Sequence, residues 1–302
     1  MSIWVCGEVL IDLIPDQSGE RTPHVGGGPA NTAKALARLG HDVQFIDGIS
    51  IDKYGQMSER ELLDDEVKLD LARRSDKPTC LAIITLNENG GASYQFEIDG
   101  TATFDFSAEW LPDPSRYKPQ VLHIGTLVTV IQPGADVLFE WALQVAEFAP
   151  IVFDPNVRSV FMSDHEKYVE AVERWVSISS VVKVSDDDMA WLYPDQSYEA
   201  VAKRWIDAGA ALVVVTRGAS GLVGFTADGS VEVPGVKVDV ADTVGAGDTV
   251  GAIIVEAMIE KGILNLTGDV LKSVLHRAAV AAGITCSRKG AQPPYKHELK
   301  GI

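Results

Sequence analysis

The sequence predicts an α/β fold built around a mainly parallel sheet, because short apolar runs alternate with helical patterns along most of the chain. The apolar runs lie at residues 3–14, 43–49, 121–127, 151–153, 181–184 and 212–216. Apolar residues recur at spacings of three and four at residues 30–39, 135–148, 166–176, 198–208 and 249–260. Helices cover both faces of such a sheet, and ligands bind beyond the carboxyl ends of its strands.

Two further pairs of apolar runs are separated by turn sequences and predict antiparallel hairpins. The pairs are residues 80–86 with 93–98, and residues 222–225 with 231–233. We expect the first hairpin, together with residues 16–25, to form a lid over one end of the sheet. We expect the second hairpin to form an edge of the main sheet.

The composition is that of an ordinary globular protein, since 46% of the 302 residues are hydrophobic and 23% are charged. A net charge of −17 repels a phosphate backbone, so we expect no nucleic-acid partner. There is no run of 18 apolar residues and no basic region before Glu8, so we expect neither a membrane span nor a signal peptide. Cys6, Cys80 and Cys286 lack metal-ligand spacing, and we expect buried, reduced thiols of a cytoplasmic protein.

Residues 242–249 read Asp-Thr-Val-Gly-Ala-Gly-Asp-Thr and stand directly before a helical pattern. Small residues at a helix N-terminus leave several backbone N–H groups available to bind an anion such as a phosphate. Asp248 would place a carboxylate where a nucleophilic hydroxyl lies in line with a transferred phosphoryl group, which makes it the candidate general base. The alternative interpretation is an N-capping aspartate on a glycine-rich turn.

A second glycine-rich junction, Gly-Gly-Gly-Pro-Ala-Asn at residues 26–31, opens the helix that ends before Gly40. Its glycines permit close approach of a ligand, and Asn31 offers a donor and an acceptor for adjacent hydroxyl groups. Taken alone, it is equally typical of a tight strand-to-helix turn. Neither loop carries the Walker A pattern or GxGxxG, which argues against a P-loop NTPase and a dinucleotide-dependent dehydrogenase.

The two glycine loops, in this order and on opposite halves of the chain, resemble the two signatures of the ribokinase-like (PfkB) carbohydrate kinases. Further matches are Gly7-Glu8, His-Ile-Gly-Thr at 123–126, Asp-Pro-Asn-Val-Arg at 154–158, Thr-Arg-Gly-Ala-Ser-Gly at 216–221 and Arg-Lys-Gly-Ala-Gln-Pro at 288–293. The resemblance covers nearly the full length. It implies one ribokinase-like three-layer α/β/α domain over residues 1–302, with a small β lid built from about residues 15–27 and 79–102.

The resemblance implies roles for the residues at matching positions. Asp248 is the implied base, and Gly245, Ala246 and Gly247 supply the implied anion hole. The residues implied at the sugar are Asp12, Gly27, Gly28, Asn31, Tyr94, Phe96 and Arg158. Those implied at the nucleotide are Lys183, Ser185, Thr216, Gly218, Gly221 and Gly247. Those that match a site for a monovalent cation are Asp242, Val244, Thr285, Arg288 and Gly290.

The cofactors implied by the resemblance are ATP and Mg²⁺, with K⁺ as an activator, and relatives commonly form homodimers through the lid edges. The family's Asn-x-x-Glu element, which organises Mg²⁺ through water, appears here as Ser185 followed by three aspartates. Asp188 takes the place of the glutamate and is one methylene shorter. For Asp186 and Asp187 we favour a solvated helix N-terminus, where the helix dipole stabilises acids.

The implied activity is ATP-dependent phosphorylation of a primary hydroxyl of a sugar. The opening Gly-Glu-x-Leu-Ile-Asp and the Gly-Gly-x-Pro-Ala-Asn loop are most similar to those of bacterial fructokinases. Relatives that act on 2-keto-3-deoxygluconate usually carry an aromatic-Arg pair in the lid hairpin, whereas this chain has Phe96, Glu97 and Ile98, so we expect neutral D-fructose. Arg158 is the one basic residue available to an acidic sugar. 2-Keto-3-deoxygluconate, ribose and a nucleoside stay open as alternative substrates, as does sugar binding without catalysis.

Overall fold

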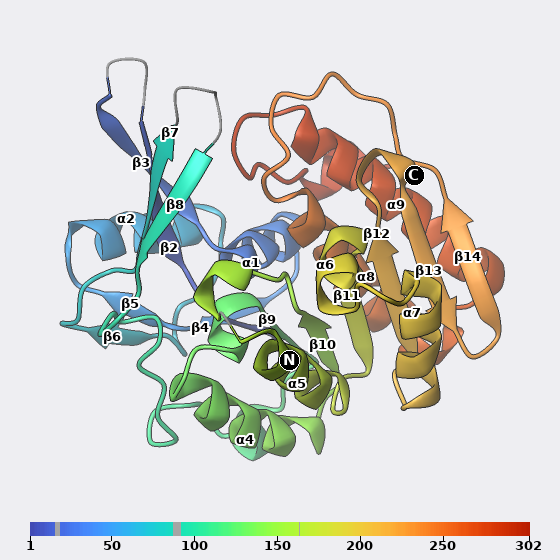
Figure 1. The fold of residues 1–302 in the computed structure, drawn as a ribbon, viewed down its shortest axis with the longest axis horizontal. Helices are drawn as coiled ribbons and strands as arrows, with labels where there is room; N and C mark the ends of the chain where they lie inside the picture. The colour runs from blue at the N-terminus through green and yellow to red at the C-terminus, as the bar shows by residue number, and fades with distance from the viewer. Residues whose placement is uncertain (16–18, 87–91, 163) are drawn as a thin grey trace.

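A central sheet lies between two layers of helices in the computed structural model, which describes residues 1–15, 19–86, 92–162 and 164–302 (Figure 1). Eight strands of the described residues form this sheet, in the order β14-β13-β12-β11-β10-β9-β1-β4. Their bounds are β1 (Ile3–Cys6), β4 (Val43–Ile46), β9 (Val121–Gly125), β10 (Ile151–Asp154), β11 (Val181–Ser185), β12 (Leu212–Thr216), β13 (Leu222–Thr226) and β14 (Gly229–Val233). The pairs from β4 to β12 are parallel, whereas β13 and β14 form an antiparallel hairpin at one edge. The predicted mainly parallel sheet and its edge hairpin are therefore confirmed.

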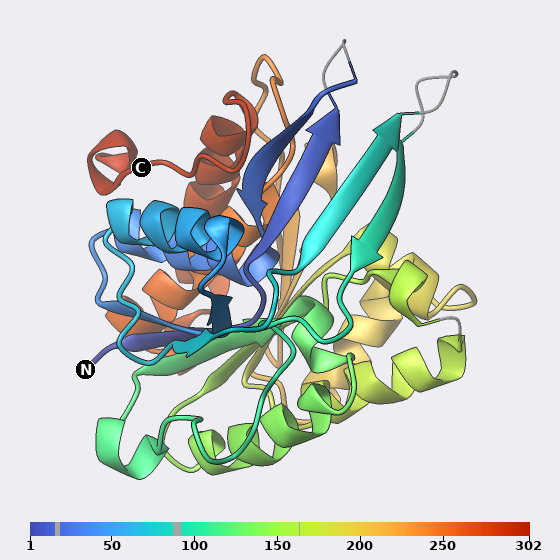
Figure 2. The same cartoon turned by 90° about the vertical axis from the view of Figure 1, so that its left-hand side faces the viewer.

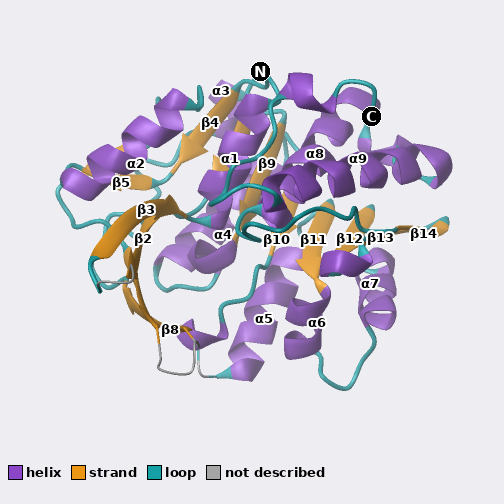
Figure 3. Ribbon diagram, turned by 90° about the horizontal axis from the view of Figure 1, so that it is seen from above, coloured by secondary structure: helices purple, strands orange, loops and turns teal. Residues whose placement is uncertain are grey.

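Side chains of each central strand point alternately to the two faces of the sheet, and both faces are buried, which explains the continuous apolar runs in the sequence. On β10, Val152 belongs to one core cluster, whereas Ile151 and Phe153 belong to the other. The first cluster is covered by α1 (Gly28–Arg38), α8 (Ala246–Lys261) and α9 (Gly268–Cys286). The second is covered by α4 (Gly134–Ala146), α5 (His165–Val176), α6 (Asp186–Leu192) and α7 (Tyr198–Asp207). Figure 3 shows α8 and α9 on one side of the strands, and α5, α6 and α7 on the other.

A smaller sheet projects from one end of the core (Figure 2). Among the described residues it has four strands in the order β3-β2-β7-β8. They are β2 (Leu10–Pro15), β3 (Arg21–Gly26), β7 (Leu81–Leu86) and β8 (Ala92–Glu97). Three of these strands fall in the segments expected to build the lid, and β2 begins before them, at Leu10. A short parallel pair, β5 (Gly48–Ser50) and β6 (Arg73–Ser75), lies near α2 (Lys53–Asp64), and α3 (Pro114–Tyr117) precedes β9.

Residues 3–14 do not form one strand, as the apolar run predicted. The run is divided between β1 in the main sheet and β2 in the smaller one. The chain changes direction at Gly7, which has φ 149°, and a Cβ atom there would lie 2.2 Å from Cγ of Pro29. Only glycine tolerates this conformation together with so close an approach. The break carries Asp12 out of the main sheet and into the smaller one.

Five predicted helical patterns correspond to α1, α4, α5, α7 and α8, whereas α2 and α9 have no counterpart among the predicted helices. The second half of α9 is rich in alanine and lies against both α8 and β14, so no polar stripe marks its period in the sequence. Cys6 and Cys80 are buried free thiols as predicted, but Cys286, at the end of α9, is only partly buried. Within the described part of the chain, no helix combines the length and the apolar character needed to span a membrane.

Trp175 of α5 is buried among aromatic rings in the second core cluster, so its substitution tests the packing of that cluster. Its ring centroid lies 5.2 Å from that of Phe139 and 6.0 Å from that of Phe153, and its indole N–H donates to the carbonyl of Thr129 over 3.0 Å. We expect Trp175→Ala to lower the free energy of unfolding by about 3–5 kcal/mol in urea titrations, through loss of packing and of this hydrogen bond. Leu264→Ala, at a side chain that is 82% exposed, is the control. Equal effects of the two substitutions would contradict this account of the core.

Candidate active site

The two glycine-rich loops of the sequence meet where α1 and α8 begin. Asn31, in the first turn of α1, donates a hydrogen bond from Nδ2 to Oδ2 of Asp248 over 2.9 Å. The hydroxyl of Thr32 donates to the backbone carbonyl of Asp248 at 3.5 Å. A Cβ atom on Gly28 would lie 3.2 Å from Oδ1 of Asp248, so the missing side chain leaves room beside that oxygen. The structure thus joins residues that the sequence placed in separate motifs.

Asp248 is a buried carboxyl group with only 8% of its surface exposed. Burial raises the pKa of Asp248 to about 6, and the nearby carboxylate of Asp154 acts in the same direction. The charge of Lys183 and the hydrogen bond from Asn31 oppose this rise. A carboxylate with a pKa in this range is ionised at neutral pH and is a better proton acceptor than an exposed one.

The N-capping interpretation of Asp248 is wrong. The N-cap of α8 is Gly245, which has φ 80°, and Asp248 lies further along the first turn. A Cβ atom on Gly245 would also lie 2.7 Å from Cβ of Ala291, so the loop needs glycine for its conformation and for its packing. The N–H of Ala246 donates to the carbonyl of Thr243 over 3.3 Å. The N–H of Gly247, in the first turn of α8, has no partner within the helix, as an anion site requires.

Most of the residues expected at the sugar lie at the start of α1 and on the smaller sheet. Gly27 caps α1 at φ 113°, and a Cβ atom there would lie 2.3 Å from the carbonyl oxygen of Glu8. Asp12 faces His24 across β2 and β3, and burial raises its pKa to about 6 against the charges of His24 and Arg158. Phe96 packs on Phe161, with ring centroids 4.3 Å apart. The side chain of Tyr94 lies outside the described part of the structure.

Arg158 stands in the loop after β10 with its side chain exposed. Its guanidinium donates to the backbone carbonyls of Asn156 and Val157, and it forms no ion pair with any described residue. Its positive charge nevertheless lowers the pKa of Asp12 and of Asp248. A cation in this position is available to a ligand.

The residues expected at the nucleotide lie at the carboxyl ends of β11 and β12. Ser185 and Thr216 are register partners on these strands, and the hydroxyl of Thr216 donates to the carbonyl of Val184 at 3.5 Å. Gly218 and Gly221 follow in the loop after β12, with φ of 50° and 95°. Both glycines adopt backbone conformations that other residues rarely take.

The three consecutive aspartates open α6. The hydroxyl of Ser185 accepts from the backbone N–H of Asp188, and the Asp188 carboxylate reaches back to the N–H of Ser185, which completes a capping box. The predicted helix N-terminus for Asp186 and Asp187 is therefore confirmed. Oδ1 of Asp188 also accepts from the N–H of Val157 over 3.1 Å, and burial raises the pKa of Asp188. These backbone contacts hold the carboxylate inward, near the end of the sheet.

The residues expected to hold a monovalent cation come together at the end of α9. Asp242 accepts hydrogen bonds from the N–H groups of Gly290, at 2.9 Å, and of Val244, at 3.1 Å. Thr285 shares a hydrogen bond of 2.9 Å with Thr249, the residue after Asp248. Arg288 is held by the carbonyls of Gln292 and Pro293 and by the Glu298 carboxylate. No three His, Cys, Asp or Glu side chains of the described residues form a metal-binding group.

Comparison with known proteins assigns this fold and its glycine loops to a family. The profile of the pfkB family of carbohydrate kinases matches residues 2–298. The chain belongs to this family. A fructokinase of Rhizobium leguminosarum bv. trifolii is 35% identical over 260 residues, which are 85% of this chain and 79% of that relative. A fructokinase of Klebsiella pneumoniae is 28% identical over 99% of this chain and 98% of its own length.

Solved structures of pfkB kinases share the complete fold. A fructokinase of Xylella fastidiosa with bound ATP has a TM-score of 0.91 at 26% identity and covers 99% of this chain and 96% of its own. A fructokinase of Vibrio cholerae O395, in a form with fructose, ADP and calcium ion, has a TM-score of 0.87 at 27% identity and covers 99% and 98%. The predicted family and ribokinase-like α/β/α fold are therefore confirmed.

Asp154, Glu8 and His123 are buried polar residues of this pfkB kinase to which the sequence assigned no role in the site. Asp154 pairs over 2.7 Å with the buried Lys183, which we expected at the nucleotide. Glu8 is 1% exposed, and its Oε2 has no hydrogen-bond partner in the described structure. His123 is 2% exposed, and neither ring nitrogen has a partner there. All of them lie in the sequence matches to the family or beside them, but in the sequence each is simply a polar residue in an apolar run.

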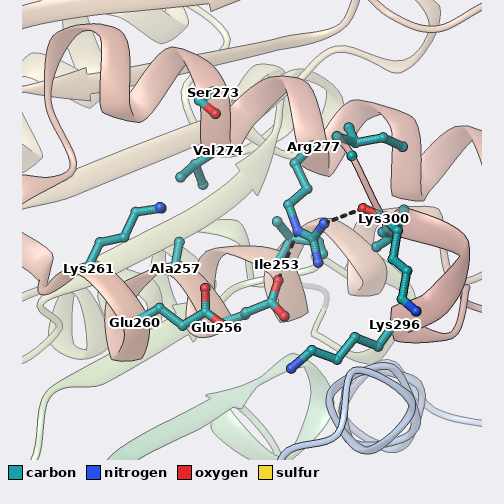
Figure 4. Close-up of a pocket in the computed structure, with 13 residues that line it drawn as sticks. Ile253, Glu256, Ala257, Glu260, Lys261, Ser273, Val274, Arg277, Lys296 and Lys300 are labelled. Atoms are coloured by element: carbon teal, nitrogen blue, oxygen red, sulfur yellow. Dashed lines mark hydrogen bonds and ion pairs between the residues drawn. The ribbon is translucent and has the colours of Figure 1, made fainter.

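A separate pocket of about 390 Å³ lies between α8, α9 and the C-terminal turn η5 (Lys296–Leu299). Figure 4 shows Arg277 in this pocket, bonded to the Glu256 carboxylate and to the carbonyl of Leu299, with Lys261 and Lys296 nearby. None of the predicted site residues lines it. The pocket is thus distinct from the site around Asp248.

Glu8→Gln tests the buried carboxyl group. Burial raises the pKa of Glu8 to about 8, whereas the unfolded chain releases this proton near pH ~4.5. Between these values the unfolded state binds fewer protons, so wild-type stability falls as pH rises. We expect the unfolding free energy of Glu8→Gln, relative to that of wild type, to increase by up to about 4 kcal/mol between pH ~5 and pH ~8 in urea titrations. The same substitution at the exposed Glu166 is the control, and a difference independent of pH would exclude the raised pKa.

Proposed function

We propose that this pfkB kinase is an ATP-dependent fructokinase that transfers the γ-phosphoryl group of ATP to the primary 6-hydroxyl of D-fructose. The observation that carries the proposal is the buried Asp248 carboxylate, hydrogen bonded to Asn31 and placed in the first turn of α8. It combines a proton acceptor with an anion site, which are the two elements that transfer of a phosphoryl group to an alcohol needs. The relatives named fructokinase, over most or all of the chain, support fructose as the alcohol.

In the proposed reaction, the sugar oxygen forms a bond to the γ-phosphorus while the bond from that phosphorus to the bridging oxygen breaks. ADP leaves with the electron pair of the broken bond, and Asp248 takes the proton of the attacking hydroxyl. The amides of Gly245, Ala246 and Gly247 would hold the phosphoryl oxygens, for which the N–H of Ala246 must release the carbonyl of Thr243. Positioning and charge stabilisation supply most of the acceleration because the transition state is loose, and the base contributes about 10²–10⁴-fold.

The sugar would lie between Asp248 and the smaller sheet, which acts as the lid. Asn31 and Asp12 suit adjacent hydroxyl groups, and the absence of side chains at Gly27 and Gly28 leaves space for the ring. Phe96, together with Tyr94, would cover the apolar face of the sugar. Closure of the lid would exclude water and so limit hydrolysis of ATP.

The nucleotide would lie along the carboxyl ends of β11 and β12, against Ser185, Thr216, Gly218 and Gly221. Carboxylate oxygens are the ligands that Mg²⁺ prefers, and the inward Asp188 fits this ion through a water molecule. Bound Mg²⁺ would neutralise charge on the phosphates. The backbone loop of Asp242, Val244, Thr285, Arg288 and Gly290 would hold K⁺. We further propose a cytoplasmic homodimer, since pairing would protect the edge strands of the lid.

Asp248→Asn tests the assigned base. The amide keeps the shape of the carboxylate but accepts no proton, so we expect kcat to fall about 10²–10⁴-fold with little change in ATP affinity. The rate is followed by ADP release, and ATP binding by calorimetry. Asp269→Asn removes an exposed aspartate from the first turn of α9 and should leave both quantities unchanged. Retention of most activity by Asp248→Asn would refute the role of this residue.

The substrate is tested by an ADP-release assay with fructose, 2-keto-3-deoxygluconate, ribose and adenosine. The keto acid is the second candidate because Arg158 has a guanidinium without a carboxylate partner among the described residues. We expect fructose to give the highest kcat/KM, and Arg158→Gln to change it less than tenfold (a loss below about 1.4 kcal/mol). Preference for the keto acid, with loss of that preference in Arg158→Gln, would overturn the choice of fructose. Repetition with EDTA, or with tetramethylammonium in place of K⁺, tests the two ions.

A further inference from the structure

Three neighbouring strands place a row of polar side chains on one face of the main sheet. His123 on β9 is the register partner of Val152, and Asp154 lies two residues further along β10 on the same face. Val152 is in turn the partner of Val181, which brings Lys183 opposite Asp154 on the next strand. The rest of this face is apolar and belongs to the cluster under α1, α8 and α9. Burial of ionisable groups on an apolar face costs desolvation free energy, which indicates that this row has a function.

Helix α8 fits over this row through two glycines one turn apart. A Cβ atom on Gly247 would lie 3.1 Å from Nζ of Lys183, and one on Gly251 would lie 3.5 Å from Nε2 of His123. Glycine inside a helix is less favourable than alanine by about 1 kcal/mol. Here its use allows the first turn of α8 to approach the ammonium group closely. Asp248 directly follows Gly247 in this first turn of α8.

Lys183 and Asp154 form a buried ion pair. Nζ lies 2.7 Å from Oδ2 of Asp154, and the side chains are 6% and 4% exposed. Desolvation makes such a pair a weak source of stability, because burial removes both charges from water. Burial also lowers the pKa of His123 to about 4, so the imidazole stays neutral and adds no charge. The lysine is the cationic group of this row.

We propose that the Lys183–Asp154 pair is a positioning pair, which fixes a positive charge beneath the first turn of α8 and thereby sets the charge state of Asp248, instead of contacting the nucleotide. The inference rests on the proposed role of Asp248 as the base of the fructokinase reaction. Asp154 holds the ammonium group of Lys183 in place. The absence of a side chain at Gly247 lets this ammonium group lie close to the first turn of α8. The pair acts on the reaction only through Asp248 and the α8 amides.

The charged and polar groups that act on Asp248 come from several elements around it. They are Glu8 after β1, Asn31 on α1, Asp154 on β10, Arg158 in the following loop and Lys183 on β11. Lys183 is the foremost influence that opposes burial and lowers the pKa of Asp248, whereas Asp154 raises that pKa. Removal of the cation should therefore make the base harder to ionise, and removal of the anion should make it easier. A pair that only stabilised the fold would not produce opposite shifts.

The test is the pH dependence of kcat/KM for fructose at saturating MgATP, in wild type, Lys183→Met, Asp154→Asn and the double variant. The value of kcat/KM rises with pH as Asp248 ionises. The acidic limb of the pH profile, where kcat/KM falls toward low pH, therefore reports the protonation of Asp248. We expect the limb to move up by roughly one pH unit in Lys183→Met, about a tenfold change in proton affinity, and down in Asp154→Asn. In the double variant the limb should lie between those of the two single variants. The double variant leaves no unpaired buried charge. If Asp154→Asn does not fold, the test still decides, because the limb of Lys183→Met should lie at higher pH than those of wild type and of the double variant.

Limbs that coincide in all variants, or that move in one direction in both single variants, would overturn the inference. A higher KM for ATP in Lys183→Met with an unmoved limb would instead make Lys183 a direct nucleotide ligand, which also overturns it. Asp248→Asn separates this failure from failure of the proposed function. If that variant keeps the wild-type limb, Asp248 is not the base; if it loses the limb while Lys183→Met does not shift it, only the present inference fails.

Discussion

The hydrogen bond from Asn31 to Asp248 is the contact on which the organisation of the site depends. It joins two glycine-rich loops that are 217 residues apart in the chain, and it sets the N-terminus of α1 beside that of α8. Each loop alone is an ordinary strand-to-helix junction. Together they bring the buried carboxylate of Asp248 to the N-terminus of α8, next to the start of α1. The proposed chemistry at a hydroxyl group depends on this meeting of the two loops.

The smaller sheet is built from segments on both sides of α1. The chain leaves β1 at Gly7, forms β2 and β3, and then returns at Gly27 to begin α1, whereas β7 and β8 arrive later from the other side of α2. A small apolar cluster of Leu10, Cys80, Ala82 and Leu127 packs the base of the smaller sheet against the residues after β9. The smaller sheet and the loop that begins α1 are therefore parts of one continuous stretch of chain.

The sequence predicted the parts of this protein that depend on local pattern. Alternating apolar runs gave the parallel sheet, and glycine loops before helical patterns located Asp248 and Asn31. It did not predict that residues 3–14 divide between two sheets, because the break depends on the contact of Gly7 with Pro29 of a later helix. Nor did it reveal the pair of Lys183 with Asp154, since the register of β10 and β11 alone brings them together. Such contacts are properties of the assembled fold and carry no signal in a single stretch of sequence.

The central claim is that Asp248 accepts a proton from a sugar hydroxyl that lies in line with the γ-phosphorus of ATP. The measurement that tests it most directly is a crystal structure of the wild-type protein with fructose, Mg²⁺ and a non-hydrolysable ATP analogue. The account predicts that the 6-hydroxyl oxygen lies about 2.6–3.2 Å from a carboxylate oxygen of Asp248 and faces the γ-phosphorus. A 6-hydroxyl held by another group, with Asp248 out of its reach, would contradict the account.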